Sequence, residues 1–92
     1  MGKYIVTYDL CKPQQDYVGL INCLKLYSAC KITESCWLLA SSLAAKEIRD
    51  NLRQYLDSND RIMIAALTGE SAWQNLITST PEVKSLLSIN AQ

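Results

Sequence analysis

Histidine is absent from the 92 residues of this chain. Because histidine is the usual general base, the base of Ser-His-Asp triads and the commonest metal ligand, its absence excludes those three kinds of site. Nine Lys and Arg residues balance nine Asp and Glu residues, so the formal net charge is zero. Most nucleic-acid-binding proteins rely on a clustered positive field, and this balance does not favour one.

Glycine and long apolar runs are also scarce. The three glycines stand far apart, at positions 2, 19 and 69, so the chain has no glycine-rich phosphate-binding loop. No apolar run approaches the roughly 20 residues of a membrane-spanning helix. The first residues lack the apolar core of a signal peptide. We therefore expect a cytoplasmic protein that does not associate with membranes.

The composition is that of a folded chain, with 49% apolar and 20% charged residues. A chain of this length predicts one domain, spanning residues 1–92. The four cysteines contain no Cys-x-x-Cys pair and no histidine accompanies them, so we expect reduced, mostly buried thiols rather than a zinc site. A disulfide or four-thiolate site is the alternative for these positions, which are Cys11, Cys23, Cys30 and Cys36.

Hydrophobic periodicity predicts alternating strands and helices. Residues 3–9 are β-branched and aromatic and predict a strand, and helical spacing over 17–27 predicts a helix that Asp16 begins as N-cap. The apolar run 61–67 predicts a strand buried on both faces. A second helix follows the cap residues Ser41 and Ser42, with a buried stripe of Ala45, Ile48, Leu52, Tyr55 and Leu56.

Residues 30–40 leave the topology open. They form an extended stretch of eleven residues, long for one strand, with polar Thr33-Glu34-Ser35 in the middle. If the stretch splits, the order is βαββαβ, a ferredoxin-like α+β sandwich; if it does not, the order is βαβαβ, a small parallel unit. Residues 70–87 predict a helical C-terminal tail, with a helix around 72–77 and another beginning at Thr80-Pro81.

Short motifs are spread along most of the chain. They are Tyr8-Asp9-Leu10, Pro13, Asp16-Tyr17, Glu34-Ser35, Trp37-Leu38, Glu47-Ile48-Arg49-Asp50, Leu56-Asp57, Asn59-Asp60-Arg61 and Ala72-Trp73. Together they resemble the pattern of a set of small bacterial and phage proteins described as SinR-like. The first strand, residues 4–10, also resembles the opening strand of the small CRISPR-associated ferredoxin-like nucleases, the partner subunit of the CRISPR integrase.

The resemblance implies a ferredoxin-like fold, which favours splitting residues 30–40, and a homodimer. In the CRISPR-associated family the aspartate at the Asp9 position lies at the dimer cleft, where it binds a divalent metal in members that cut RNA or DNA. Other members act structurally. This implies two functions for Asp9: paired carboxylates that hold Mg²⁺ or Mn²⁺, or a structural role at a turn or interface.

Three groups of residues are further candidates. Lys12 and Arg61 are candidates for nucleic-acid contacts, and Arg61 is also able to pair with Asp9 or Asp60. Glu34 and Ser35 predict a bend or an interface. The remaining aromatic candidates for interface anchors, which also suit a core, are Tyr8, Trp37 and Trp73.

We therefore expect a homodimeric interaction or scaffold module, resembling the small CRISPR-associated nucleases and acting in bacterial or phage defence or counter-defence. This function implies a protein partner. Whether the protein also binds a nucleic acid stays open at this point. The alternatives are a metal-dependent nuclease built on paired Asp9 carboxylates, or an mRNA-cutting toxin of the virulence-associated protein D kind.

Overall fold

The computed structural model describes residues 2–11 and 17–88. In this part of the chain, four strands alternate with three helices in the expected order, and the stretch 30–40 is split by a turn at Glu34-Ser35. The elements are β1 (Gly2–Asp9), α1 (Val18–Lys25), β2 (Ser28–Thr33), β3 (Cys36–Ser41), α2 (Ala45–Arg53), β4 (Arg61–Ala66) and α3 (Thr80–Leu87).

The strands form one sheet in the order β2-β3-β1-β4. Each neighbouring pair is antiparallel: β2 with β3, β3 with β1, and β1 with β4. The chain therefore folds as a small α+β protein with a four-stranded antiparallel sheet. The parallel βαβαβ alternative is wrong, because the polar turn at Glu34-Ser35 reverses the chain and makes β2 and β3 a hairpin.

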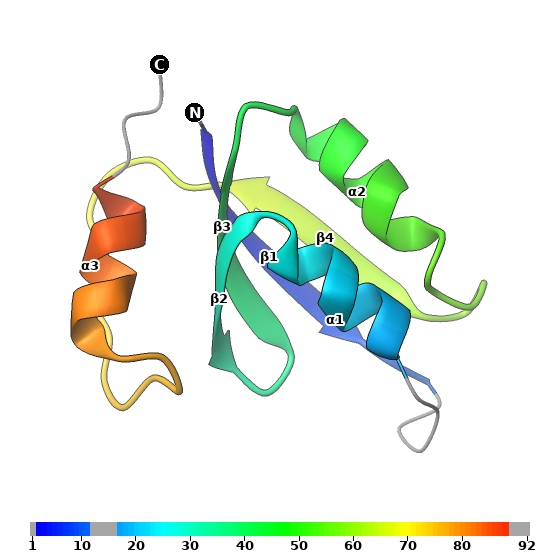
Figure 1. Cartoon of the computed structure of the whole chain (residues 1–92), viewed down its shortest axis with the longest axis horizontal. Coiled ribbons are helices and arrows are strands. Elements are labelled where there is room, and N and C mark those ends of the chain that lie inside the picture. The colour runs from blue at the N-terminus through cyan, green and yellow to red at the C-terminus, as the bar shows by residue number, and fades with distance from the viewer. Residues whose placement is uncertain (1, 12–16, 89–92) are drawn as a thin grey trace.

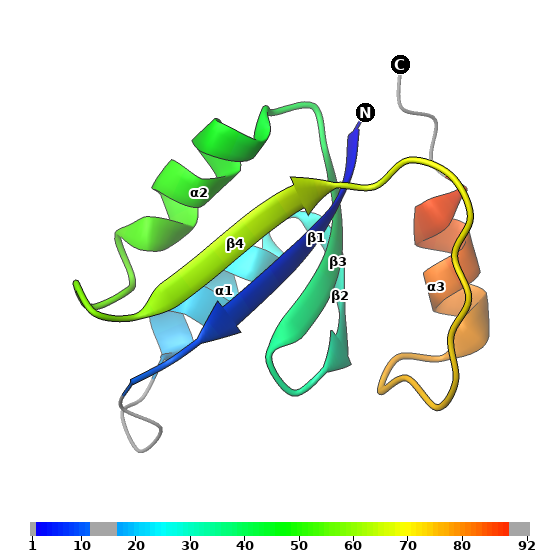
Figure 2. The same cartoon turned by 180° about the vertical axis from the view of Figure 1, so that it is seen from behind.

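The helices lie on both sides of this sheet. Helices α1 and α2 pack side by side on one face, whereas α3 lies on the other side against β2 and β3 (Figure 1). Seen from behind, β1 and β4 stand in front with no helix over them (Figure 2). On this second face of the sheet, α3 therefore covers β2 and β3 and leaves β1 and β4 without a helix.

The main core lies beneath α1 and α2. Side chains of a strand alternate between the two faces of its sheet, so every second residue of β1 and β3 enters this core. Leu20 and Leu24 of α1 meet Ile48 and Leu52 of α2, and all four are fully buried. The strand residues in this core are Tyr4, Val6, Tyr8, Trp37 and Leu39.

A second, smaller core lies beneath α3. Val83 and Leu86 point from the helix onto Ile32, Leu38 and Ala40 of β2 and β3. This packing explains the nearly continuous apolar sequence of β3, because both of its faces are covered.

The predicted helix around 72–77 is wrong, and the helical tail 70–87 is correspondingly shorter. Residues 68–79 are irregular, and only Thr80–Leu87 are helical. Gly69 and Asn75 have backbone φ angles of 101° and 55°, which a right-handed helix excludes. The segment instead bonds to the edge of the sheet, where the Ile77 N–H donates to the Ile32 carbonyl at 3.0 Å. A helix this short has little stability of its own, so bonds to the sheet prevail.

Strand β4 is not buried on both faces as predicted. Its residues alternate between exposed and partly buried, and Met63 is 64% exposed. The reason is tertiary: β4 is an edge strand, and α3 packs on β2 and β3 at the far side of the sheet. Ile62 and Ile64 face the main core, as an apolar run requires, but the opposite side chains have nothing over them.

The helix termini differ from the predicted ones by one to three residues. Helix α1 begins after Tyr17, and the predicted cap Asp16 lies outside the described residues. Helix α2 begins after Ala44, whose backbone N–H donates to the Glu47 carboxylate at 3.1 Å. The predicted cap residue Ser41 ends β3 instead, and its hydroxyl accepts a bond from the Leu43 N–H.

In the described part of the chain, no helix has the length and apolar character needed to cross a bilayer.

Candidate functional site

The uncovered half of the sheet is the main unpartnered surface of the fold. We call it the open face and define it by the side chains of β1 and β4 that point away from α1 and α2. It carries two partly buried apolar side chains, one polar and one apolar side chain that are exposed, a pair of opposite charges at one end and a lysine at the other. Its residues are Lys3, Ile5, Thr7, Asp9, Arg61, Met63 and Ala65.

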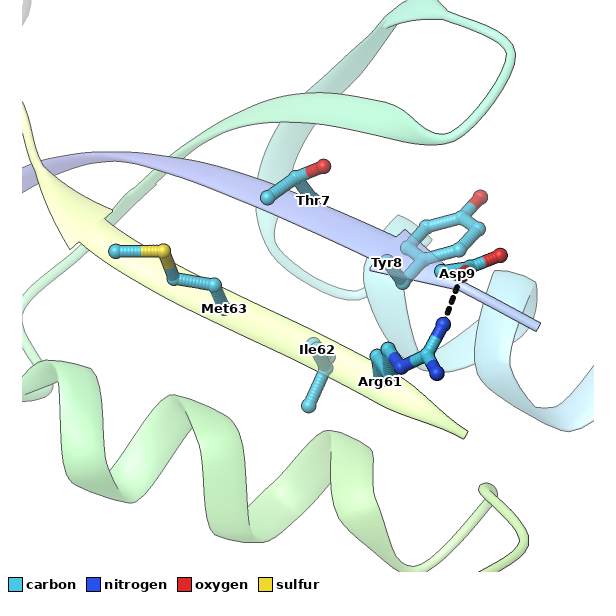
Figure 3. Close-up of a pocket in the computed structure, with 6 residues that line it drawn as sticks. All are labelled: Thr7, Tyr8, Asp9, Arg61, Ile62 and Met63. Atoms are coloured by element: carbon cyan, nitrogen blue, oxygen red, sulfur yellow. Dashed lines mark hydrogen bonds and ion pairs between the residues drawn. The ribbon is translucent and has the colours of Figure 1, made fainter. Parts of the chain in front are cut away.

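The strand register places these residues in facing pairs. Asp9 lies opposite Arg61, Thr7 opposite Met63, and Ile5 opposite Ala65. The charged pair therefore stands at one end of the open face, Thr7 and Met63 stand in the middle, and the apolar pair of Ile5 and Ala65 lies toward the other end. A shallow hollow of about 200 Å³ lies at the charged end, lined by residues 7–9 and 61–63 (Figure 3).

Asp9 and Arg61 form an ion pair. The Arg61 guanidinium donates from Nη1 to Oδ2 of Asp9 at 2.8 Å, as the dashed line in Figure 3 marks. The side chains are 66% and 77% exposed, respectively. Of the two partners that the sequence left open for Arg61, the structure selects Asp9. Such an exposed pair contributes at most about 1 kcal/mol to folding, so it does little for the stability of a single chain.

The surroundings of Asp9 do not fit a metal ion within one chain. The nearest charged group is a guanidinium, which occupies one carboxylate oxygen. Across residues 2–11 and 17–88, no three His, Cys, Asp or Glu side chains gather closely enough to hold an ion. A divalent cation prefers several oxygen ligands, and this site supplies one carboxylate already neutralised by Arg61.

Tyr8 and Trp37 lie on the opposite face, in the main core. They are 7% and 5% exposed, and the Trp37 indole N–H donates to the Tyr8 hydroxyl at 3.2 Å. Both belong to the half of their strands that α1 and α2 cover. Their burial favours the core role and argues against direct contact with a partner.

Glu34 and Ser35 lie away from the open face, whereas Trp73 lines a pocket together with Ile5, where the open face meets the part of the sheet that α3 covers. Glu34 and Ser35 form the exposed β2–β3 turn, which confirms the predicted bend, and Glu34 pairs with Lys31 at 3.9 Å. Trp73 is partly buried against the core beneath α3, and its indole N–H reaches the Thr80 hydroxyl at 3.5 Å. Lys12, the other predicted nucleic-acid contact, lies outside the described residues.

Asp60 has a structural role that the sequence analysis did not assign. Its carboxylate accepts the backbone N–H groups of Cys11 and Asp57, both at 2.8 Å, and the Tyr17 hydroxyl at 3.1 Å. It thereby joins the end of β1, the start of α1 and the turn before β4. The Asp57-Ser58-Asn59-Asp60 run was a signal for a turn, but the two distant partners are set by the tertiary fold.

All four cysteines are free thiols, but the expectation that they are mostly buried holds fully for Cys23 alone, because Cys30 and Cys36 are partly buried and Cys11 is exposed. Burial raises the pKa of the Cys23 thiol. Burial is also the main cause of the raised pKa values of Cys30 and Cys36, opposed in part by hydrogen bonds from Thr78 and Thr33. Cys11 is exposed, and its thiol donates to the Asn59 carbonyl at 2.8 Å. A raised pKa keeps a thiol protonated and less reactive, so Cys23, Cys30 and Cys36 are poor candidates for nucleophiles.

The fold and the open face define the chain as a small α+β protein with one uncovered half-sheet. No known protein family matches it in a comparison with family models. Among solved structures it is similar to a hypothetical protein, TT1823, from Thermus thermophilus, with a TM-score of 0.64 and 25% sequence identity. The match covers 79% of this chain and 89% of that one. The likeness concerns the fold and names no activity.

Proposed function

We propose that this protein is a non-enzymatic interaction module that acts as a homodimer through its open face. The observation that carries the proposal is the uncovered half of the sheet, where Met63 is 64% exposed while the neighbouring half is sealed by α3. A sheet normally buries an apolar face against another layer. A second copy supplies that layer, and the unbranched Met63 side chain adapts easily to a partner surface.

The charges of the open face support a second copy as its occupant. One carboxylate and one guanidinium stand side by side at one end of it, so that end is neutral and attracts neither strongly acidic nor strongly basic partners, while the cation at the other end, Lys3, is bonded to α3. A surface that binds its own copy must be complementary to itself, and a balanced pair of charges meets that condition.

We further propose that the chain has a ferredoxin-like fold and is related to the SinR-like and small CRISPR-associated proteins. The βαββαβ order and the antiparallel strand order β4-β1-β3-β2 support the first proposal. The motif Tyr8-Asp9-Leu10 at the end of β1 supports the second. On this proposal the module works in the cytoplasm, in bacterial or phage defence or counter-defence, where the homodimer also recruits a protein partner.

The oligomeric state of the wild type and two variants tests the proposed dimer. Met63→Asp places a charge in the middle of the open face, whereas Leu26→Asp places the same charge on an 87% exposed residue at the end of α1. By light scattering and sedimentation, we expect dimers for the wild type and Leu26→Asp and monomers for Met63→Asp. A monomeric wild type, or a Met63→Asp dimer as tight as the wild type, would contradict the proposal.

A nuclease that uses Asp9, or an mRNA-cutting toxin, is the competing hypothesis. It is tested by incubating wild type and Asp9→Ala with labelled RNA, single-stranded DNA and duplex DNA in Mg²⁺ or Mn²⁺. The ion pair with Arg61 supports the expectation that neither protein cuts. If the wild type cuts in a metal-dependent way and Asp9→Ala does not, the protein is a nuclease and the proposed interaction module is wrong.

A further inference from the structure

We propose that Asp9 and Arg61 pair crosswise between the two copies of the dimer and select a second copy of this chain as partner. This inference rests on the proposed homodimer and adds its geometry. Asp9 and Arg61 are opposite each other on adjacent strands, and both point out of the open face. Their side chains are well over half exposed, so a docking surface reaches them directly.

The existing bond leaves most of the hydrogen-bonding capacity of the pair unused. It joins Nη1 of Arg61 to Oδ2 of Asp9. Among the residues that the structure describes, no other hydrogen bond is formed by these two side chains. A guanidinium offers five N–H donors and a carboxylate about four acceptor positions, so each group has room for a second partner of opposite charge.

One symmetry axis satisfies both groups at once. A twofold axis that runs between β1 and β4, parallel to the strands, lays β1 of one copy over β4 of the other. Asp9 then faces the partner's Arg61, and Arg61 faces the partner's Asp9. The four charges form a ring in which every side chain lies between two opposite charges.

The same axis matches the rest of the open face. Met63 lies over the partner's Thr7, and Ile5 lies over the partner's Ala65, because these residues are paired across β1 and β4 in the same register. Stacked sheets lie about 10 Å apart, and their side chains meet in the space between them. The apolar contacts therefore lie beside the ring of charges and exclude water from one side of it.

A twofold axis perpendicular to the strands does not bring opposite charges of the two copies together. It places the Asp9–Arg61 end of one copy over the opposite end of the other, where Lys3 and Leu67 follow in the register. Lys3 there donates to the Leu87 carbonyl at 2.8 Å and is committed to holding α3. Charge complementarity thus selects the axis along the strands.

Charge exchange tests the ring. Asp9→Lys gives a copy with two positive groups at this site, and Arg61→Asp gives a copy with two negative groups. Each variant alone sets like charges against each other across the axis, which we expect to weaken its homodimer at least about tenfold. In a mixture of the two variants, each charge at position 9 or 61 of one copy faces an opposite charge of the other copy. A heterodimer is therefore expected at wild-type affinity. The double variant that carries both changes is expected to recover a homodimer.

The matched control uses a second exposed Arg–Asp pair, Arg49 and Asp50 on α2, whose Nη2 and Oδ1 atoms are 2.9 Å apart. Arg49→Asp and Asp50→Lys are expected to leave the dimer unchanged. Circular dichroism establishes that each variant is folded, and sedimentation of single and mixed samples measures the association.

Each outcome decides the inference. Weakened single variants and a restored mixture support the ring. A wild-type dimer whose single variants associate as tightly, or whose mixture is not restored, overturns the ring and leaves the proposed homodimer in place. A wild type that is monomeric at all concentrations overturns both.

Discussion

The buried indole of Trp37 donates a hydrogen bond to the hydroxyl of Tyr8 across the two central strands of the sheet, at 3.2 Å. The register pairs Trp37 with Val6, so Tyr8 is its diagonal neighbour, within reach of an aromatic side chain. Both rings are almost fully buried beneath α1 and α2. Tyr8 therefore satisfies a polar group that the fold has removed from water.

Tyr8→Phe is expected to destabilise the protein by about 1–3 kcal/mol, because it leaves the Trp37 N–H buried without its acceptor. Urea unfolding followed by tryptophan fluorescence measures the change. Tyr27→Phe is the matched control, since its hydroxyl accepts a bond from Asn51 at an exposed site. We expect the control to change the free energy of unfolding by less than about 0.5 kcal/mol. Equal effects of the two variants would contradict a special role for the buried bond.

Asp60→Ala is expected to lower stability by about 2–3 kcal/mol, because three donors from separate segments lose one charged acceptor. Chemical denaturation of the purified variant measures this loss. Asp50→Ala serves as the control, because its carboxylate pairs with Arg49 and Arg53, its neighbours on the same helix. A loss no greater than that of Asp50→Ala would show that the junction at Asp60 is dispensable.

Stability is expected to fall as the solution becomes alkaline. Burial raises the pKa of the Cys23, Cys30 and Cys36 thiols above the ordinary value. Above about pH 8.5 the unfolded chain releases these protons before the folded chain does, so the unfolded state gains relative stability as pH rises. The contribution is fully present below that pH and is lost as pH passes through the raised pKa values. Urea midpoints between pH 7 and pH 10 measure it, and a Cys23→Ala variant is expected to show a shallower decline.

Cys11 is expected to react with a thiol reagent before the other three cysteines. It is exposed, whereas Cys23 is 8% exposed and burial keeps it protonated. Titration of the native protein with a chromogenic disulfide should show one fast thiol, and unfolding should release the remaining thiols. Cys11→Ser is expected to remove the fast phase alone. A fast phase that persists in Cys11→Ser would place the accessible thiol elsewhere.

Local sequence accounts for most of the elements. The polar Glu34-Ser35 pair is a turn, as one of the two alternatives for residues 30–40 required, and it fixes the antiparallel hairpin. The strands 3–9 and 61–67 lie within a residue of their predicted ends. These successes rest on alternation and turn chemistry, which act over a few residues. Of the candidate site, the sequence also indicated the Asp9–Arg61 pairing as one of two choices.

What the sequence by itself determined was the order and type of the strands and helices outside residues 30–40 and 72–77, and the need for an apolar core, because periodic apolar side chains require a face to bury. The tertiary structure alone decided where α3 packs, and with it that Met63 is exposed while Leu38 is buried. It also decided that residues 68–79 are irregular rather than helical, because the Ile77 N–H donates a hydrogen bond to the Ile32 carbonyl of β2. These outcomes depend on contacts between residues distant in sequence, whose energies outweigh the small local preferences of a short segment.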